Sequence, residues 1–157
     1  MSPEARPLAA LVTLILLGLA GCAEAPAAPA PEASRALNPN ETPELRALIE
    51  RYSQTYGVPV ALTQRVVIRE STHNPGARNG PYYGLMQILP ATARQMGYQG
   101  SPDGLLDAET NLKFAVKYLR GAWLVADGDP DAAVGWYSRG YYYEAKKKGL
   151  LEETGLR

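Results

Sequence analysis

Glu70 is the side chain in this sequence whose position points most directly to chemistry. It follows Val66 by four residues and Leu62 by eight, so on a helix all three lie on one face. An acid on an apolar face lies against the core or in a cleft, where desolvation disfavours the charged form and raises the pKa. A carboxylic acid that stays protonated near neutral pH is a competent general acid. On periodicity alone, the alternative is a glutamate near a helix end that reaches solvent or caps a neighbouring helix.

The composition argues against several other kinds of site. The 157 residues include one histidine, His73, and one cysteine, Cys22, which leaves no histidine-rich metal site, no disulfide framework and no zinc site built mainly from thiolates. The 16 basic residues equal the 16 acidic ones, whereas a nucleic-acid-binding protein normally has a basic excess. We therefore expect no metal, no cofactor and no nucleic-acid partner.

Two helices are predicted around Glu70. Thr42 is typical of an N-cap and Gly57 of a helix end, and these two residues bound the first helix. Pro59 begins the second helix, which carries Glu70. That helix ends before Asn74, because the residue that precedes a proline is disfavoured in the helical conformation.

The rest of the domain is predicted to consist of a loop and further helices. Residues 74–83 are rich in turn-forming residues and predict the loop. Further helices are predicted over 90–96, after Asp107, after Asp129 and over 140–148. No stretch shows the alternation of apolar and polar residues that is typical of a strand. The sequence therefore predicts an all-α fold with five to seven helices and no internal repeat.

Four short motifs follow one another along this domain. They are Glu70–Pro75 (ESTHNP), Gly84–Pro90 (GLMQILP), Asn111-Leu112 with Tyr118-Leu119, and Trp136–Gly140 (WYSRG). In order and spacing they resemble the four motifs of the lytic transglycosylases, the goose-type-lysozyme-like enzymes that cut peptidoglycan. The resemblance implies a lysozyme-like helical domain with a substrate cleft.

Four places depart from the family's pattern, and one of them is Ala115, which replaces a glycine where helices approach closely. His73 stands where the family prefers Phe or Trp, which keeps a flat ring for packing. Ser138 replaces the asparagine that usually follows the tyrosine of the fourth motif, and its hydroxyl can still donate and accept hydrogen bonds. The loop residues Pro81-Tyr82-Tyr83, where many relatives have smaller residues, are expected to alter the cleft wall.

The resemblance implies a mechanism with a single carboxyl group. Glu70 protonates the glycosidic oxygen between N-acetylmuramic acid and N-acetylglucosamine, and the substrate's own N-acetyl oxygen meets the charge that develops on the sugar. Glu70 then takes the proton of the muramoyl 6-hydroxyl, which attacks and gives a 1,6-anhydro product. Asp103, Asp107 and Glu109 lie where a helix begins, and capping explains them better than a role as a second acid.

The resemblance also implies roles for five other residues. Ser71 and Gln87 supply polar contacts near the acid. Met86 packs either against the sugar or against the catalytic carboxyl. Tyr118 and Tyr137 line the cleft, with the Tyr137 hydroxyl near the carboxyl or the N-acetyl group.

Two alternatives to the transglycosylase remain open at the sequence level. One is a muramidase that hydrolyses the same bond, which requires a positioned water. The other is a non-catalytic peptidoglycan-binding or scaffold lipoprotein that retains the fold, an idea to which the changes at His73 and Ser138 give weight.

Residues 1–21 are predicted to be a lipoprotein signal peptide. The apolar run from Leu8 to Ala20 is shorter than the roughly 20 residues of a membrane span and suits a signal-peptide core. It ends in Leu19-Ala20-Gly21-Cys22, which resembles the lipobox of bacterial lipoproteins, in which the cysteine thiol carries lipid. By the sorting rule of that family, Ala23 implies the periplasmic face of the outer membrane. The alternative is an ordinary signal peptide with a free thiol nearby.

Residues 22–41 are predicted to form an Ala/Pro-rich linker, too poor in large apolar residues to fold. Residues 42–157 are predicted to form the catalytic domain, with its folded part ending near Gly149. We expect a monomer that binds the glycan strands of peptidoglycan and is held to the membrane by a lipid anchor at Cys22.

Overall fold

The computed structural model describes residues 36–156 of the chain, which belong to one structural unit. The predicted signal peptide, Cys22 and most of the predicted linker lie outside these residues. In the described part of the chain, no helix is long and apolar enough to cross a membrane.

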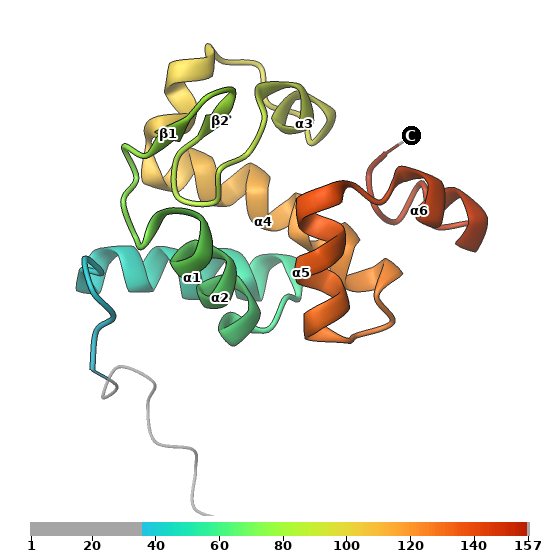
Figure 1. Cartoon of the computed structure of the whole chain (residues 1–157), viewed down its shortest axis with the longest axis horizontal. Coiled ribbons are helices and arrows are strands. Elements are labelled where there is room, and N and C mark those ends of the chain that lie inside the picture. The colour runs from blue at the N-terminus through green and yellow to red at the C-terminus, as the bar shows by residue number, and fades with distance from the viewer. Residues whose placement is uncertain (1–35, 157) are drawn as a thin grey trace, which may run out of the picture. The chain divides into compact units, whose positions relative to one another are not determined.

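The described residues form a mostly helical domain, as the sequence predicts (Figure 1). In chain order, its elements are α1 (Pro43–Tyr56), α2 (Val60–Ser71), β1 (Arg78–Asn79), β2 (Tyr82–Tyr83), α3 (Pro90–Gln95), the 3₁₀ helix η2 (Pro102–Leu106), α4 (Ala108–Val125), α5 (Pro130–Arg139) and α6 (Tyr142–Lys148). The six α-helices confirm the all-α prediction.

The helix ends are set by the capping residues that the sequence predicts. Thr42, Asp107 and Asp129 each accept a hydrogen bond on the side chain from the backbone N–H three residues later, at 3.2, 2.8 and 2.7 Å. Such N-caps satisfy backbone donors that have no partner within the helix. Gly57 ends α1 in the left-handed conformation, with φ 63°.

Helix α4 is the centre of the domain and contacts α1, α3, α5, α6 and η2 (Figure 1). A central helix must be apolar around much of its circumference. The buried residues of α4 are Asn111, Leu112, Ala115, Val116, Leu119, Gly121, Ala122 and Val125. Asn111 is the polar member of this group and lies at the start of the helix.

The structure differs from the sequence prediction between the helices. The predicted loop 74–83 contains a small antiparallel hairpin, in which Arg78 pairs with Tyr83 and Asn79 with Tyr82. Strands of two residues are too short to show an alternating pattern, so periodicity could not reveal them. The last helix also begins at Tyr142 rather than at residue 140, because the backbone of Gly140 is not helical, with φ 86° and ψ 151°.

The folded part extends beyond both boundaries that we predicted. After Gly149 the chain continues in turns, with Thr154 buried. Leu150, Leu151 and Leu156 pack against the core. At the other end, Glu41, which we assigned to the linker, is buried. The composition of the linker region could not show this, because the burial depends on a partner further along the chain.

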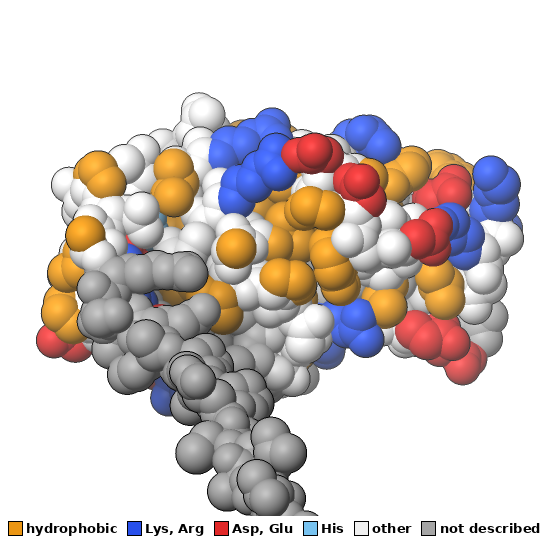
Figure 2. All heavy atoms as spheres, turned by 90° about the horizontal axis from the view of Figure 1, so that it is seen from below, with side chains coloured by type: hydrophobic (Ala, Val, Ile, Leu, Met, Phe, Trp, Pro, Cys, Tyr) orange, Lys and Arg blue, Asp and Glu red, His pale blue; other side chains and the backbone are white. Residues whose placement is uncertain are grey.

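Charged side chains of both signs lie close together on the surface, with hydrophobic side chains between them, as the face in Figure 2 shows. Some of the exposed charges form ion pairs, such as Arg51 with Glu109 at 2.5 Å and Arg65 with Asp131 at 2.6 Å. Exposed ion pairs of this kind contribute little to stability. The ion pair between Arg46 and Glu41 differs from these, because it is largely buried.

The carboxylate of Glu41 is the centre of a buried cluster of polar side chains. It accepts five hydrogen bonds: two from Asn38, two from Arg46 and one from Gln64, at 2.6–3.1 Å. The Gln64 amide in turn meets His73 Nε2 at 2.8 Å. Because His73 follows the end of α2, this cluster joins residues 38–41 to the helix that carries the predicted acid.

The hydrogen bonds decide the ionisation of Glu41. Burial by itself raises the pKa, but the donors of Arg46, Asn38 and Gln64 together lower it to about 2. A carboxyl whose folded-state pKa is lowered stabilises the fold above its unfolded-state pKa, and that stabilisation is lost as the pH falls through the folded value. The difference between the unfolded-state and folded-state pKa of Glu41 corresponds to about 3 kcal/mol of folding stability at neutral pH.

We therefore predict an acid-sensitive stability that Glu41 controls. The free energy of unfolding of the wild type should fall between about pH 5 and pH 2, and in Glu41→Gln it should be lower at pH 7 and depend less on pH in this range. Thermal unfolding followed by circular dichroism at several pH values measures both effects. Glu153→Gln, at an exposed position, is the matched control and should behave as the wild type. An equal pH dependence in Glu41→Gln and the wild type would contradict the assignment.

Candidate active site

Two adjoining hollows form a groove beside Glu70. We call the hollow of about 350 Å³ that contains Glu70 the acid half, and the neighbouring hollow of about 290 Å³ the tyrosine half. Both are lined by Tyr82, Gln87, Tyr137 and Ser138. The acid half is also lined by Arg69, Glu70 and Asn79. The tyrosine half is also lined by Ile88, Leu89, Thr92, Tyr118, Arg139 and Gly140.

Glu70 lies in the last turn of α2 with its side chain 24% exposed. Its position follows from the periodicity of the helix, since Leu62 and Val66 on the same helix are buried. Among the described residues, no donor lies within hydrogen-bond distance of its carboxylate. The nearest cation is Arg69, whose Nε is 3.6 Å from Glu70 Oε1.

Desolvation and charge act in opposite directions on this carboxyl group. Burial raises the pKa of Glu70 above its ordinary value, and the positive charge of Arg69 works against this rise. The net effect is a raised pKa. A partly buried carboxyl with a raised pKa that faces a groove can deliver a proton to a bound molecule.

Ser71 does not line either half of the groove. Its hydroxyl donates to the carbonyl of Leu85 at 2.8 Å and also lies 3.3 Å from the carbonyl of Val67, in its own helix. Ser71 therefore fastens the end of α2 to the segment that carries the second motif. The structure gives it a positioning role beside the acid.

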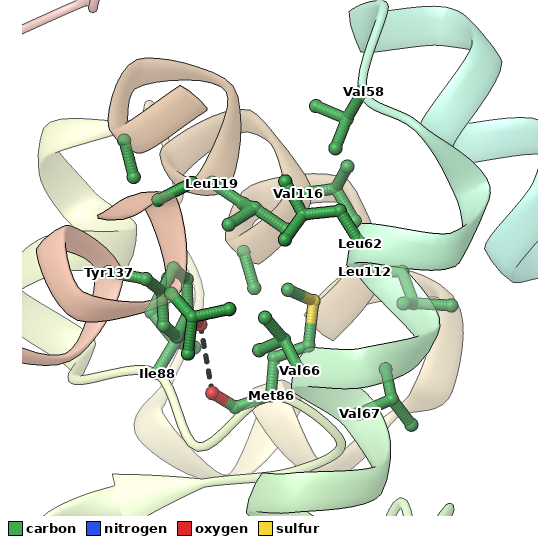
Figure 3. Close-up of a cluster of buried hydrophobic side chains, with 14 of the residues drawn as sticks. Val58, Leu62, Val66, Val67, Met86, Ile88, Leu112, Val116, Leu119 and Tyr137 are labelled. Carbon is green, nitrogen blue, oxygen red and sulfur yellow. Dashed lines mark hydrogen bonds between the residues drawn. The ribbon is translucent and has the colours of Figure 1, made fainter. Parts of the chain in front are cut away.

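Met86 is fully buried, and its side chain lies in the hydrophobic cluster with Val66 and Leu112 (Figure 3). Met86 lines neither half of the groove, so the structure does not support the predicted contact with a bound sugar, and the predicted packing against the catalytic carboxyl stays a prediction. The backbone of Met86 has the more specific role, since its carbonyl accepts a hydrogen bond from Tyr137.

Gln87 lines both halves of the groove in a strained backbone conformation, with φ 48°. Its amide nitrogen donates to the carbonyls of Ala77 and Gly84 at 3.1 and 2.8 Å. These two acceptors fix the orientation of the amide, so Oε1 is the free end. Among the described residues that oxygen has no hydrogen-bond partner although it is buried. An unpaired acceptor on a residue that lines the groove would gain from a hydrogen bond to a bound molecule.

Tyr137 and Tyr118 form the aromatic wall of the groove. The Tyr137 hydroxyl donates to the Met86 carbonyl at 2.8 Å (Figure 3). Burial raises the pKa of Tyr137, with further contributions from the charges of Glu70 and Tyr118. Burial also raises the pKa of Tyr118 to about 12. Both hydroxyls therefore stay protonated at neutral pH. The rings of Tyr118 and Tyr137 meet edge to face, with centroids 5.5 Å apart.

Asn111 fixes the segment that carries the second motif, a role that the sequence did not predict. Its amide nitrogen donates to the carbonyls of Tyr83 and Leu105, both at 2.8 Å, and its amide oxygen accepts from Met86 N–H at 3.0 Å. Gly84 is required beside it, since a Cβ there would lie 2.3 Å from Asn111 Nδ2 and the backbone has φ 73°. The asparagine of the third motif was the available signal, but nothing in its spacing indicated these partners.

Ser138, the departure in the fourth motif, lines both halves of the groove and is exposed. Its hydroxyl donates to the carbonyl of Val134 one turn earlier in α5, at 3.0 Å. A serine that bonds back to its own helix in this way leaves its face of the groove open.

Two residues of the acid half were not predicted, Arg69 and Asn79, whereas Tyr82 belongs to the loop that we expected to alter the cleft wall. Asn79 and Tyr82 belong to the hairpin, and only its folding brings them to Glu70. Arg69 is adjacent to the predicted acid, and its proximity in sequence was the signal that could have identified it.

The other acids considered in the sequence analysis lie outside the groove. Asp107 caps α4, Glu109 pairs with Arg51, and Asp103 lies 3.9 Å from Arg78. Within residues 36–156, no group of three or more His, Cys, Asp or Glu side chains could hold a metal ion. A larger hollow of about 670 Å³ lies between the end of α1, α4 and the C-terminal turns, and it contains none of the predicted site residues.

Comparisons with known proteins match the same part of the chain. Residues 47–153 match the family model described as transglycosylase SLT domain. Over 95 residues the chain is 37% identical to a membrane-bound lytic murein transglycosylase F from Shewanella woodyi, a match that covers 56% of this chain and 19% of that protein. Over 81 residues it is 35% identical to a soluble lytic murein transglycosylase from Escherichia coli K12, covering 46% of this chain and 12% of that protein. The matches thus span a fifth or less of these curated relatives, and no solved structure matches significantly.

The opposing effects on Glu70 lead to a prediction that needs no substrate. Arg69→Gln removes the nearest positive charge and should raise the pKa of Glu70 further, because that charge stabilises the ionised form. The titration of the ¹³C-labelled Glu70 carboxyl followed by NMR measures this. Arg65→Gln, one turn earlier on α2 and paired with Asp131, is the matched control and should leave the pKa of Glu70 unchanged. A lower pKa in Arg69→Gln would show that Arg69 does not act on Glu70 as a charge.

Proposed function

The chain belongs to the transglycosylase SLT domain family, and we propose that it is a peptidoglycan lytic transglycosylase with Glu70 as its single general acid and base. The proposed substrate bond is the β-1,4 bond between N-acetylmuramic acid and N-acetylglucosamine. The observation that carries the proposal is that Glu70 is the one carboxylate among the described residues lining the groove, partly buried and with a raised pKa. The names of the two relatives support the same class of reaction.

In the first step, protonated Glu70 donates its proton to the glycosidic oxygen. The bond between that oxygen and C1 of the muramoyl residue breaks, and the N-acetylglucosamine end leaves with a hydroxyl at C4. The positive charge at C1 is met by the N-acetyl oxygen of the same sugar, so the protein does not need a second carboxylate as nucleophile. Glu70 is now an anion.

In the second step, the Glu70 carboxylate takes the proton from the muramoyl 6-hydroxyl. The oxygen of that hydroxyl attacks C1 and forms the 1,6-anhydro ring, and the N-acetyl oxygen is released. The attack is intramolecular and therefore benefits from a high effective concentration. Glu70 ends the cycle protonated as it began, and no water is consumed.

The environment of Glu70 fits this exchange of roles. A carboxyl with several strong donors would be held as an anion, as Glu41 is, and could not return a proton. Around Glu70 the described residues provide only Arg69 at 3.6 Å. Arg69 supports the anion after the first step, while partial burial favours the acid before it.

The other groove residues are proposed to hold the substrate. The free Oε1 of Gln87 accepts a hydrogen bond from a hydroxyl or N-acetyl N–H group of the glycan. Tyr118 and Tyr137 provide the aromatic wall of the tyrosine half, and Tyr137 also supports the Met86 carbonyl from α5. Ser71 keeps the acid in place through Leu85.

Replacing the acid tests the mechanism. Glu70→Gln keeps the shape of the side chain but cannot donate a proton, so the rate of peptidoglycan cleavage should fall by about 10²–10⁴-fold with the thermal stability preserved. The products of purified peptidoglycan are analysed by mass spectrometry, in which anhydro ends are one water molecule lighter than hydrolysed ends. Glu50→Gln, a glutamate of α1 outside the groove, is the control and should cleave as the wild type.

The products also separate the proposed activity from its alternatives. Anhydro ends that depend on Glu70 support the transglycosylase. Reducing ends alone would identify a muramidase and overturn the lyase mechanism. No cleavage by any variant would identify a binding or scaffold protein.

We also propose that the chain is anchored by lipid at Cys22 on the periplasmic face of the outer membrane. The support is the signal-peptide pattern that ends at Cys22, and these residues lie outside the described part of the chain.

Cys22→Ser should abolish both the incorporation of labelled palmitate and the recovery of the protein in the outer-membrane fraction, because the hydroxyl cannot form the thioether. Ala28→Ser, a similarly small change in the linker, should leave both unchanged. An unlabelled wild-type chain would rule out the anchor.

A further inference from the structure

Tyr82 has a place in the groove that the proposed mechanism does not use. It is one of four residues that line both the acid half and the tyrosine half. Of these four, Tyr137 is nearly buried and Gln87 is held by two backbone carbonyls. The side chain of Tyr82 has no such attachment: among the described residues its hydroxyl has no hydrogen-bond partner and its ring has no aromatic or cationic neighbour. The residue is 42% exposed.

The neighbouring residue explains why the Tyr82 ring faces the groove. Consecutive side chains of a strand point to opposite sides. Tyr83 occupies the inner side: it is buried, its backbone exchanges two 3.1 Å hydrogen bonds with Ile88, and its carbonyl accepts from Asn111. Arg78 lies over the Tyr83 ring at 4.6 Å. Because these contacts hold Tyr83 on the inner side of β2, the side chain of Tyr82 lies on the opposite side, which faces the groove.

The hairpin therefore presents the exposed ring of Tyr82 on the groove side. The hairpin fixes the backbone of Tyr82, and a tyrosine side chain has only two χ angles to restrict, so it loses little conformational freedom when it binds while its ring offers a large flat contact area. On the opposite element α5, the Ser138 hydroxyl is turned back to Val134. The short Ser138 side chain thus leaves space for a ligand beside the Tyr82 ring.

We propose that Tyr82 is the platform on which a sugar ring of the bound glycan packs, at the junction of the two halves of the groove and next to Glu70. The C–H face of a pyranose is apolar and matches the face of an aromatic ring, while the hydroxyls at the sugar's edge remain free to meet polar groups such as Gln87 Oε1. This inference rests on the proposed function for its substrate class, a glycan. It assigns binding and specificity, not proton transfer, to Tyr82.

The experiment uses two readouts in the full chain. The first is the affinity for the N-acetylglucosamine tetramer, measured by calorimetry, which contains no muramoyl residue and so reports binding without the proposed reaction. The second is the KM for peptidoglycan cleavage. Tyr82→Ala should weaken tetramer binding and raise KM by about tenfold, the usual consequence of truncating a tyrosine at a binding hot spot. The loss should fall on KM more than on kcat.

Two further variants separate the ring from other effects. Tyr82→Phe keeps the ring and should bind the tetramer within about twofold of the wild type, as expected for stacking rather than a hydroxyl contact. Tyr143→Ala removes an even more exposed tyrosine, 83% exposed and outside the groove, and should leave both readouts unchanged. Thermal unfolding should be unchanged in all three, because neither ring is buried.

The outcomes distinguish this inference from the proposed function. A Tyr82-dependent affinity in a chain that never cleaves peptidoglycan would retain the platform and reject the enzyme. Glu70-dependent cleavage with unchanged affinity and KM in Tyr82→Ala would retain the enzyme and reject the platform. The platform is also rejected if the wild type does not bind the tetramer, if Tyr82→Phe loses as much as Tyr82→Ala, or if Tyr143→Ala loses equally.

Discussion

The amide of Asn111 is the interaction on which the rest of the groove depends. Its three hydrogen bonds use both ends of a fully buried side chain, and they hold three backbone groups that come from two different segments. One of these groups belongs to Met86, whose carbonyl receives the Tyr137 hydroxyl. A buried amide with every group paired favours one arrangement, because any shift leaves polar atoms unsatisfied. The central helix α4 thereby sets the positions of the second and fourth motifs relative to each other.

Two glutamates of the domain show how the fold assigns opposite roles to the same side chain. Glu41 is buried and Glu70 is partly buried, and burial by itself raises the pKa of a carboxyl group. Glu41 receives five hydrogen bonds and is held as an anion, whereas Glu70 has only Arg69 nearby and keeps a raised pKa. The first carboxylate ties the start of the domain to α2, and the second faces the groove. The number of donors, more than the burial, separates a structural carboxylate from one that can exchange a proton.

The departures from the family's motifs are accommodated in different ways. His73 replaces a larger aromatic residue, and its ring is buried and bonded to Gln64, which is itself bonded to Glu41. One ring nitrogen, Nε2, therefore has a polar partner, whereas the buried Nδ1 has no hydrogen-bond partner among the described residues. Ser138 is exposed, and its hydroxyl donates a hydrogen bond to a carbonyl of its own helix. The first change affects the support of α2 and the second affects the width of the groove.

The sequence by itself determined the helices, their caps and the helix face that carries Glu70, because these depend on residues a few positions apart. It also indicated the family through four motifs. Only the tertiary structure decided that Met86 is buried, that Glu41 belongs to the domain and that Tyr82, rather than Tyr83, faces the groove. Each of these depends on partners far along the chain: Asn111 and Tyr137 for Met86, Gln64 for Glu41, and Ile88 and Asn111 for the hairpin of Tyr82. Local patterns report local hydrogen bonds and faces, whereas the partner of a buried polar group is chosen when distant segments pack together.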